Sequence, residues 1–277
     1  SQYRSETSIL KTKTLQVIGK LNFSARAYHT LQKVVENNCR KLNEYCRLAL
    51  QAGEIEPEVY DAAVALGERI NIQVLSALLQ KKGHKAEAVN GYDLIVTNNV
   101  HTNAGHLQPQ TRLKSTAVLS PILKEGIIPI ISGFCGFTEE GAITTLGREG
   151  SDYSASILAE SLLADELWIW SDVNGILTSD PALFEDAVQI PEMSYDEVYE
   201  LAFNGARVLH PKTIFPAKKA GIPIRVRNTF EPDNPGTLIC KECKADRNLV
   251  KAVTSNESVS LISLKKRSTE DSALLEE

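Results

Sequence analysis

Apolar positions in the first third of the chain recur at intervals of three and four residues, which is the spacing of one face of an α-helix. In residues 27–49 this spacing predicts a long amphipathic helix. A second helix is predicted over residues 57–82, because Pro57 suits a first helical turn and Gly83 can end the helix. Gly67 interrupts the apolar stripe of this second helix and weakens it locally.

After Gly83 the pattern changes to short β-rich runs separated by stretches of helical spacing. Ser194 is a natural N-cap and Pro211 suits a first helical turn. Strands that alternate with helices predict the α/β class, with an open, parallel-rich sheet sandwiched between two helical layers. The predicted strands are 94–97, 127–132, 167–173, 222–226 and 237–239, and the predicted helices are 115–124, 151–163, 195–203 and 212–220.

A length of 277 residues permits one large domain or two ordinary ones, and the pattern favours one domain with a tail. The domain is expected to cover residues 1–245. Its last strand follows a turn at 231–236 that is rich in Pro, Asp and Asn. The tail, residues 246–277, holds a further β-like run at 250–264 and a charged end, and it can be the start of a regulatory domain.

The formal net charge of -5, with both signs interspersed, provides no basic field for nucleic acid and no polybasic segment for an anionic membrane. No apolar run approaches the roughly 20 residues that cross a bilayer, and the polar start lacks the core of a signal peptide. A cytoplasmic location is therefore expected. Five scattered cysteines suit a reducing compartment. The Cys240-Lys-Glu-Cys243 pair cannot fill a four-ligand zinc site, so no metal site is predicted among the side chains.

The strongest candidate for chemistry is Gly133-Phe-Cys-Gly136, followed by residues 144–153 and a helix. Small residues permit close backbone approach, and the free N–H groups at the start of the helix form an anion site. Arg148 adds a planar fork that can hold a carboxylate with two hydrogen bonds. Asp152 falls in the first helical turn, where a carboxylate serves equally well as a cap or as a binding group.

Four further blocks follow in order: Ile169-Trp-Ser-Asp-Val-Asn-Gly-Ile176 with Ser179-Asp-Pro181, Phe203-Asn-Gly-Ala-Arg-Val-Leu-His-Pro211, Ile222-Pro-Ile-Arg-Val-Arg-Asn-Thr-Phe230, and Gly236-Thr-Leu-Ile239. Together with residues 133–155, they resemble the aspartate kinases, over residues 66–239. The resemblance implies an amino-acid-kinase fold that binds ATP and Mg²⁺ over the carboxyl ends of the strands. It implies transfer of the γ-phosphate of ATP to the side-chain carboxylate of L-aspartate, the first step of the lysine, threonine and methionine pathway.

The resemblance also implies roles for residues in the amino-acid half of the site. Glu68, in Leu66-Gly-Glu-Arg69, would bind the α-ammonium of aspartate, and Arg148 its carboxylate. Ser151 would join that pocket. Asp152 would be the acidic catalytic group that organises basic side chains around the transferring phosphoryl group.

On the nucleotide side, the resemblance places Ser171 and Asp172 beside the nucleotide and Asn228 where the chain passes the adenine. Arg207 stands where the family usually has a phosphate-binding lysine, so it is expected both to bind the nucleotide and to serve catalysis. His210 is expected to make a turn contact. The family also implies a homo-oligomer, commonly a dimer.

This sequence departs from the family pattern in places. Leu177 replaces a tyrosine near the nucleotide, Ala182 replaces an arginine, and the Lys-Phe-Gly-Gly segment is not found. Residues 14–20 have a strand-like texture and end in Gly19-Lys20, a weak substitute. Three readings therefore stay open: a working aspartate kinase, a relative with another acceptor, and an impaired or non-catalytic binding or regulatory subunit. Trp168 and Trp170 alternate along a strand, and packing in the core or between layers is expected for both.

Overall fold

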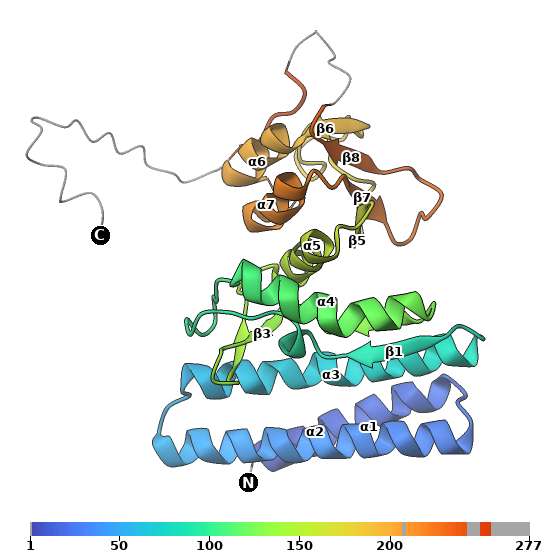
Figure 1. The fold of residues 1–277 in the computed structure, drawn as a ribbon, viewed down its shortest axis with the longest axis vertical. Coiled ribbons are helices and arrows are strands. Elements are labelled where there is room, and N and C mark those ends of the chain that lie inside the picture. The colour runs from blue at the N-terminus through green and yellow to red at the C-terminus, as the bar shows by residue number, and fades with distance from the viewer. Residues whose placement is uncertain (1, 207–208, 243–249, 256–277) are drawn as a thin grey trace, which may run out of the picture.

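A layer of three long helices forms one end of the molecule, as the computed structural model shows (Figure 1). The structure describes residues 2–206, 209–242 and 250–255. The three helices are α1 (Gln2–Lys20), α2 (Ala25–Ala52) and α3 (Pro57–Lys81). Both helices predicted for this region are confirmed, each to within a few residues. The strand-like interpretation of residues 14–20 was wrong, because this segment is the last part of α1.

The helical layer is held together by a small apolar core. Ile18 of α1 packs with Leu31, Val35 and Cys39 of α2, and Ile18 is only 1% exposed. Leu15 packs against this cluster three positions before Ile18. The segment 14–20 therefore has helical spacing as well as β-branched content. Burial of Ile18 against α2 therefore favours the helix over a strand. The β-propensity of a residue is a weak guide by itself, because it depends on how the side chain is packed.

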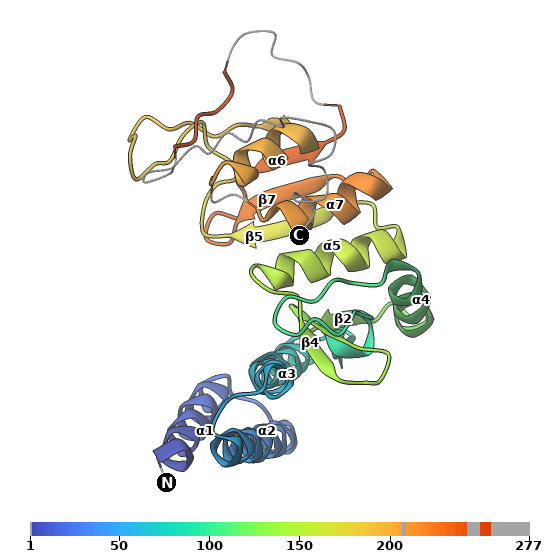
Figure 2. The same cartoon turned by 90° about the vertical axis from the view of Figure 1, so that its left-hand side faces the viewer.

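The middle of the molecule holds two small sheets. Strand β1 (Ala86–Val89) pairs in parallel with β2 (Ile128–Ile131), and β3 (Cys135–Phe137) pairs antiparallel with β4 (Ile143–Thr145). The turn η1 (Gly91–Asp93) and helix α4 (Gln108–Lys124) connect β1 to β2, and α5 (Gly150–Leu162) follows β4. Figure 2 shows α3 on one side of this region and α5 on the other.

The far end holds a four-stranded sheet in the order β5-β7-β8-β6. Strands β5 and β7 are parallel, as are β6 and β8, whereas β7 and β8 are antiparallel. The strands are β5 (Leu167–Ser171), β6 (Glu192–Ser194), β7 (Ile224–Asn228) and β8 (Thr237–Cys240), and the helices beside them are α6 (Tyr195–Phe203) and α7 (Pro211–Ala220). The expected α/β class with parallel-rich sheets is confirmed, although the strands form three sheets instead of one.

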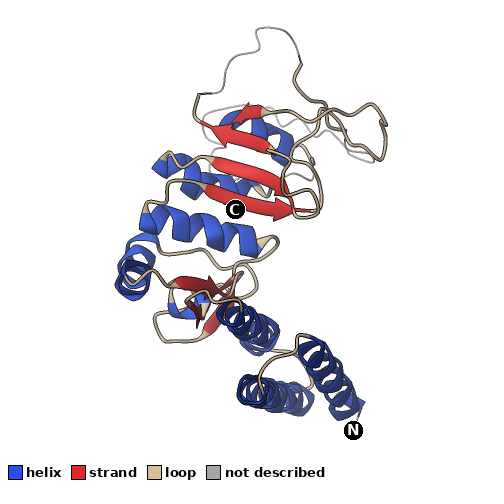
Figure 3. Cartoon of the chain, turned by 90° about the vertical axis from the view of Figure 1, so that its right-hand side faces the viewer, coloured by secondary structure: helices blue, strands red, loops and turns tan. Residues whose placement is uncertain are grey.

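Each strand of the larger sheet sends alternate side chains to a shared core. Ile169, Ile224 and Ile239 pack there with residues from α5, α6 and α7. Figure 3 shows the strands in front of these helices. The alternate side chains that do not enter the core therefore lie on the face of the sheet that points away from the helices. Packing was the wrong expectation for Trp168 and Trp170, which are 46% and 45% exposed on that face. They stack against Arg227, with distances of 4.6 and 5.1 Å from its guanidinium carbon to the ring centroids.

Two predicted strands differ from the structure. Residues 94–97 are buried but form only isolated bridges, from Val96 to Phe137 and from Thr97 to His106. Part of their hydrogen bonding goes to a side chain, since the backbone N–H of Val96 donates to Thr111 Oγ1, so no regular ladder forms. The described part of the β-like run, residues 250–255, is not a strand either, and residues 256–264 lie outside the described residues. The division at residue 245 stays a prediction.

Helix α3 has the length and composition of a membrane span, with a mean hydropathy of 1.3 in its most apolar window. Only 22% of that window is buried in the protein. The helix nevertheless packs against α2, β1 and β4, and its first half carries Asp61 and Glu68 toward the middle of the molecule. These contacts make α3 an internal element that joins the helical layer to the sheets.

Candidate functional site

The candidate site lies at the edge where the carboxyl ends of β5 and β7 meet the N-termini of α5 and α7 (Figure 2). In an open α/β sheet, ligands bind outside the carboxyl ends of the strands. The two helix N-termini add unpaired backbone N–H groups that favour anions. This edge therefore combines two features that suit a phosphorylated ligand.

The start of α5 is packed so tightly against the chain after β2 that two glycines are required. A Cβ atom added to Gly133 would lie 2.9 Å from Ser151 Cβ, and one added to Gly150 would lie 2.9 Å from Phe134 Cβ. Before the helix, Glu149 adopts the left-handed conformation with φ 54°. Such a conformation is unfavourable for a residue other than glycine, and it is often found at functional sites.

Asp152 lies in the first turn of α5, half-buried, and its carboxylate has no hydrogen-bond or ion-pair partner among residues 2–206, 209–242 and 250–255. Burial, followed by the nearby Glu149 carboxylate, raises the pKa of Asp152. The N-cap residue Glu149 makes no side-chain hydrogen bond to this helix, and both roles of Asp152, as a cap and as a binding group, stay predictions. A carboxylate in the first turn of α5 without such a partner is suited to bind a cationic group, either of a ligand or of a side chain that changes its position.

Arg148 precedes α5 and reaches into solvent, with its side chain 79% exposed. Its Nε lies 3.7 Å from Glu149 Oε1, an exposed and weak ion pair. The guanidinium is therefore available for a carboxylate ligand. Ser151, the second residue of the helix, is also exposed.

Glu68 approaches the same region from α3. Its carboxylate accepts a hydrogen bond from Asn71 Nδ2 at 3.2 Å. The buried Cys135 connects Glu68 to the β3–β4 hairpin, since burial first, then Glu68 and Asp61, raise the pKa of Cys135 to about 12. Cys135 is the Cα partner of Thr145, three residues before Arg148. Glu68 and the strand that leads into the Arg148 turn therefore both lie near Cys135 of this hairpin.

The nucleotide-side candidates are brought together by strand register. Ser171 and Asn228 are paired at the carboxyl ends of β5 and β7. Asn228 is buried, and its amide makes a hydrogen bond at each end: Nδ2 donates to Asn174 Oδ1 at 2.8 Å, and Oδ1 accepts from the Phe230 backbone N–H at 2.9 Å. Asp172 is exposed beside Ser171, whose Oγ donates to it at 3.2 Å. Asn228 thus shapes the loops after both strands.

Arg207 lies outside the described residues, but another cation, which sequence reasoning missed, stands at this edge. Lys212, in the first turn of α7, donates from Nζ to Asn103 Oδ1 at 2.7 Å. A Cβ atom added to Gly147 would lie 2.6 Å from the same Asn103 oxygen, so Lys212 lies next to the Arg148 turn. His210 makes the expected turn contact, accepting from the Lys212 backbone N–H. A lysine after the helix-opening His-Pro was the available signal.

The described side chains offer little for a metal ion on their own, since no group of three His, Cys, Asp or Glu residues gathers anywhere among them. Cys243 lies outside the described residues, so the Cys240-Lys-Glu-Cys243 pair is not described as a whole. Asp152 and Asp172 are the carboxylates at the candidate edge. This donor set fits Mg²⁺ that arrives with nucleotide phosphates and needs only one or two protein ligands.

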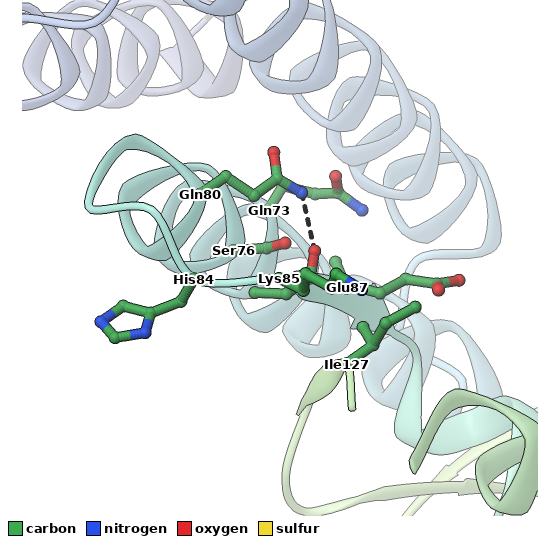
Figure 4. A pocket seen from close by; sticks show the side chains of 9 residues that line it. Gln73, Ser76, Gln80, His84, Lys85, Glu87 and Ile127 are labelled. Atoms are coloured by element: carbon green, nitrogen blue, oxygen red, sulfur yellow. Dashed lines mark hydrogen bonds between the residues drawn. The ribbon is translucent and has the colours of Figure 1, made fainter. Parts of the chain in front are cut away.

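A cavity beside the β1–β2 sheet, of about 610 Å³, is separate from this edge (Figure 4). It lies between the second half of α3 and β1, where Gln80 Nε2 donates to the Ala86 carbonyl at 2.7 Å. Gln73, His84 and Glu87 also line it. None of the candidate site residues does.

Comparisons with known proteins show the family of this chain. Residues 15–228 match the family model described as the amino acid kinase family. The chain is 32% identical over 233 residues to Aspartokinase 2, chloroplastic, of Arabidopsis thaliana, covering 83% of this chain and 43% of that protein. It is 40% identical over 190 residues to Aspartokinase 2 of Bacillus subtilis (strain 168), covering 69% of this chain and 45% of that protein.

A solved structure of E. coli aspartokinase III in complex with aspartate and ADP superposes with a TM-score of 0.78 at 30% identity. The alignment covers 87% of this chain and 52% of that one. The chain thus spans about half the length of the relatives that it matches. With more than half of its residues matched by the family model, the chain belongs to the amino acid kinase family, and within it resembles the catalytic part of aspartokinases.

Proposed function

We propose that this chain binds ATP and L-aspartate and transfers the γ-phosphate to the aspartate side chain, giving 4-phospho-L-aspartate and ADP. The observation that carries the proposal is that Glu68 and the strand leading into the Arg148–Ser151 turn both lie beside Cys135 of the β3–β4 hairpin. In the proposed site the anionic Glu68 and the cationic Arg148 would bind the two charges, one of each sign, at the α-carbon of an amino acid. A solved relative whose description names aspartate and ADP supports the same choice.

In the proposed reaction, Glu68 binds the α-ammonium group and Arg148 a carboxylate of aspartate, with Ser151 as a hydrogen-bonding neighbour. An oxygen of the substrate side-chain carboxylate attacks the γ-phosphorus, and the bond from that phosphorus to the ADP oxygen breaks. No protein nucleophile is needed, because the substrate supplies it. The protein mainly positions the two oxygens and stabilises charge on the moving group.

The charge on the phosphates is proposed to be met by Arg207, by Lys212 and by the N–H groups at the start of α5. Ser171 and Asp172 would hold the nucleotide at the end of β5. Mg²⁺ bound to the phosphates would neutralise part of their charge, and Asp152 is placed to organise the cations around them. The raised pKa of Asp152 supports this role, because a cation would stabilise its ionised form.

The test is calorimetric titration of the purified chain with MgATP and with L-aspartate, separately and together, followed by an aspartate hydroxamate assay at saturating MgATP. The proposal predicts binding of both ligands and aspartate-dependent formation of ADP. Titrations with glutamate, acetylglutamate and a nucleoside monophosphate are matched controls for another acceptor. Binding of one of these in place of aspartate would overturn the proposed substrate.

A second candidate function is a binding or regulatory subunit of the same family with little turnover. Leu177, Ala182 and the Lys-Phe-Gly-Gly segment not found in this sequence favour it, because the resemblance to aspartate kinases implies a tyrosine, an arginine and a phosphate-binding lysine in their places. Aspartate binding without ADP formation, in the full natural form of the protein, would support this candidate over the kinase.

The wider assignments are also proposals. We propose an aqueous, cytoplasmic setting, since the exposed apolar part of α3 belongs to a helix that packs on both sides within the protein. A homodimer and a place in the biosynthesis of the aspartate-derived amino acids are proposed by similarity to aspartokinases.

A further inference from the structure

Asp61 is the most deeply buried carboxylate beside the candidate site, with an exposed fraction of 0%. It accepts three hydrogen bonds from two other segments. Thr145 Oγ1 donates to Oδ1 at 2.6 Å, and the Thr102 backbone N–H donates to Oδ2 at 2.9 Å. His101 Nδ1 lies 3.0 Å from Oδ2 and must carry its hydrogen there, because a carboxylate only accepts. Charge-assisted hydrogen bonds of this kind are the strong ones in proteins.

The first of these bonds reaches the turn that carries Arg148. Thr145 is the last residue of β4, and only Leu146 and Gly147 separate it from Arg148. Asp61 is also about two turns from Glu68 on α3, a spacing that places both on similar faces of the helix. One carboxylate therefore links the helix that carries Glu68 to the strand that leads into the Arg148 turn.

The other two bonds hold a strained loop against the same turn. Thr102 has φ 67°, which is unfavourable for a β-branched residue, and its N–H is the one that Asp61 accepts. Two residues later, the Ala104 N–H donates to the Thr145 carbonyl at 2.8 Å. Between them, Asn103 is held against Gly147 and accepts a hydrogen bond from Lys212.

From these contacts we propose that Asp61 is a positioning residue of the amino-acid pocket, acting through Thr145 and the 101–104 loop to fix the Arg148 turn. The inference rests on the proposed function. Asp61 itself is buried behind His101 and Thr145, so it reaches no substrate directly. Its effect on a ligand must pass through Arg148, and more weakly through Asn103 to Lys212.

The decisive variant is Asp61→Asn, which keeps the size of the side chain but turns one acceptor into a donor that faces the Thr145 hydroxyl or the Thr102 N–H. We expect the Kd for aspartate to rise by about tenfold to a hundredfold, the range for a lost hydrogen bond to a charged group. The Kd for MgATP should stay within about threefold. Thr145→Ser should resemble the unaltered chain, and Thr145→Val should share part of the loss.

The matched control is Ser115→Ala in α4, another fully buried side chain whose hydroxyl donates to a backbone carbonyl, that of Thr111, at 2.6 Å. It should lower the melting temperature without changing the ratio of the two Kd values. If Asp61→Asn behaves like this control, or weakens both ligands equally, Asp61 is only a packing residue and the proposal fails. Should Asp61→Asn fail to fold, Thr145→Val and Thr145→Ser decide the question by the same ratio.

Hydrogen exchange separates this inference from the proposed function, because it needs no ligand. Asp61→Asn should speed exchange of the Thr102 and Ala104 N–H groups, while the N–H groups of α2 keep their rates. Unchanged exchange at Thr102 and Ala104 would overturn the positioning role. If the unaltered chain binds no aspartate but Asp61→Asn loosens these N–H groups, the proposed function fails and the positioning of the turn stands.

Discussion

At the scale of single residues, the site is defined by charged groups that lack a strong partner in the free protein. Arg148 is largely exposed with one weak ion pair, and Asp152 is half-buried with a raised pKa. Within the part of the chain that the structure describes, Glu68 has only an amide donor, Asn71. Charges in this state are suited to bind a ligand, since little has to be broken before the ligand arrives.

We expect Arg148→Ala to raise the Kd for aspartate by roughly tenfold to a hundredfold, because a charge-assisted pair to a small dicarboxylate is lost. The Kd for MgATP should change far less. Arg148→Lys should rescue poorly, since an ammonium cannot reproduce the two-pronged geometry. Calorimetry with each ligand measures the difference, and an equal loss of both ligands would remove Arg148 from the amino-acid pocket.

Asp152→Asn should stabilise the free protein at neutral pH. Burial and Glu149 raise the pKa of Asp152 in the folded state, so between the ordinary value of 3.8 and the raised value the folded state binds more protons than the unfolded state. Stability contributed by this group therefore falls as the pH rises through that window. Denaturant unfolding of both proteins should show a gap at pH 7 that closes below about pH 3.8.

A gap that persists at low pH would mean that the substitution acts through helix capping and not through ionisation of Asp152. The same variant should slow phosphoryl transfer in any active form, because the carboxylate is proposed to organise the cations. A more stable but slower protein would be the expected combination for a functional residue.

At the scale of elements, the sequence contained enough local information to place most helices. Their ends carry explicit signals, such as Pro57, the Ser194 N-cap and Pro211, and all three are used as predicted. The strand-like interpretation of residues 14–20 was wrong, because it followed their β-branched content and not their three-residue spacing. The residues that bury Ile18 lie on another helix, α2. Residues 94–97 do not form the predicted regular strand, because the N–H groups of Leu94 and Ile95 donate to the Gly91 carbonyl and that of Val96 donates to Thr111 Oγ1, which no local pattern reveals.

Ser194→Ala should destabilise the protein by about 1 kcal/mol, the usual effect of removing an N-cap. Ser194 Oγ accepts from the Glu197 N–H at 3.2 Å, and the Glu197 carboxylate accepts from the Ser194 N–H at 2.7 Å, so both halves of a capping box are present. Urea unfolding measures the change. Ser5→Ala, at an exposed position within α1, is the control and should change stability by less than about 0.5 kcal/mol. Equal effects would show that the box contributes nothing.

At the scale of the whole molecule, the site draws on segments that are far apart in the sequence. Glu68, Arg148 and Lys212 come from α3, the turn before α5 and the start of α7. Sequence blocks could nominate Glu68 and Arg148 through a family resemblance, and the parallel register of β5 with β7 explains why Ser171 meets Asn228. Lys212 and Asp61 could not be found in this way, because their importance depends on Asn103 and Thr145, which are distant in the chain.

The same long-range geometry decides which lysine can serve the nucleotide. Lys20 ends α1 and is exposed, and the next residue, Leu21, accepts a hydrogen bond from Lys81 at the far end of α3. From Lys81 to Glu68 the helix extends for about 20 Å at 1.5 Å per residue, so Lys20 lies far from the candidate edge. Lys212 lies at that edge, beside Asn103 and the Arg148 turn.

The last prediction therefore compares Lys20→Ala with Lys212→Ala, two variants that each remove one cation from a helix end. Lys212→Ala should raise the Kd for MgATP by about tenfold and weaken its dependence on salt, because a contact with phosphate is lost. Lys20→Ala should leave the Kd unchanged at every salt concentration. Calorimetry at two ionic strengths measures both. A loss confined to Lys20→Ala would contradict the placement of the nucleotide at the α5–α7 edge and move it to the helical layer.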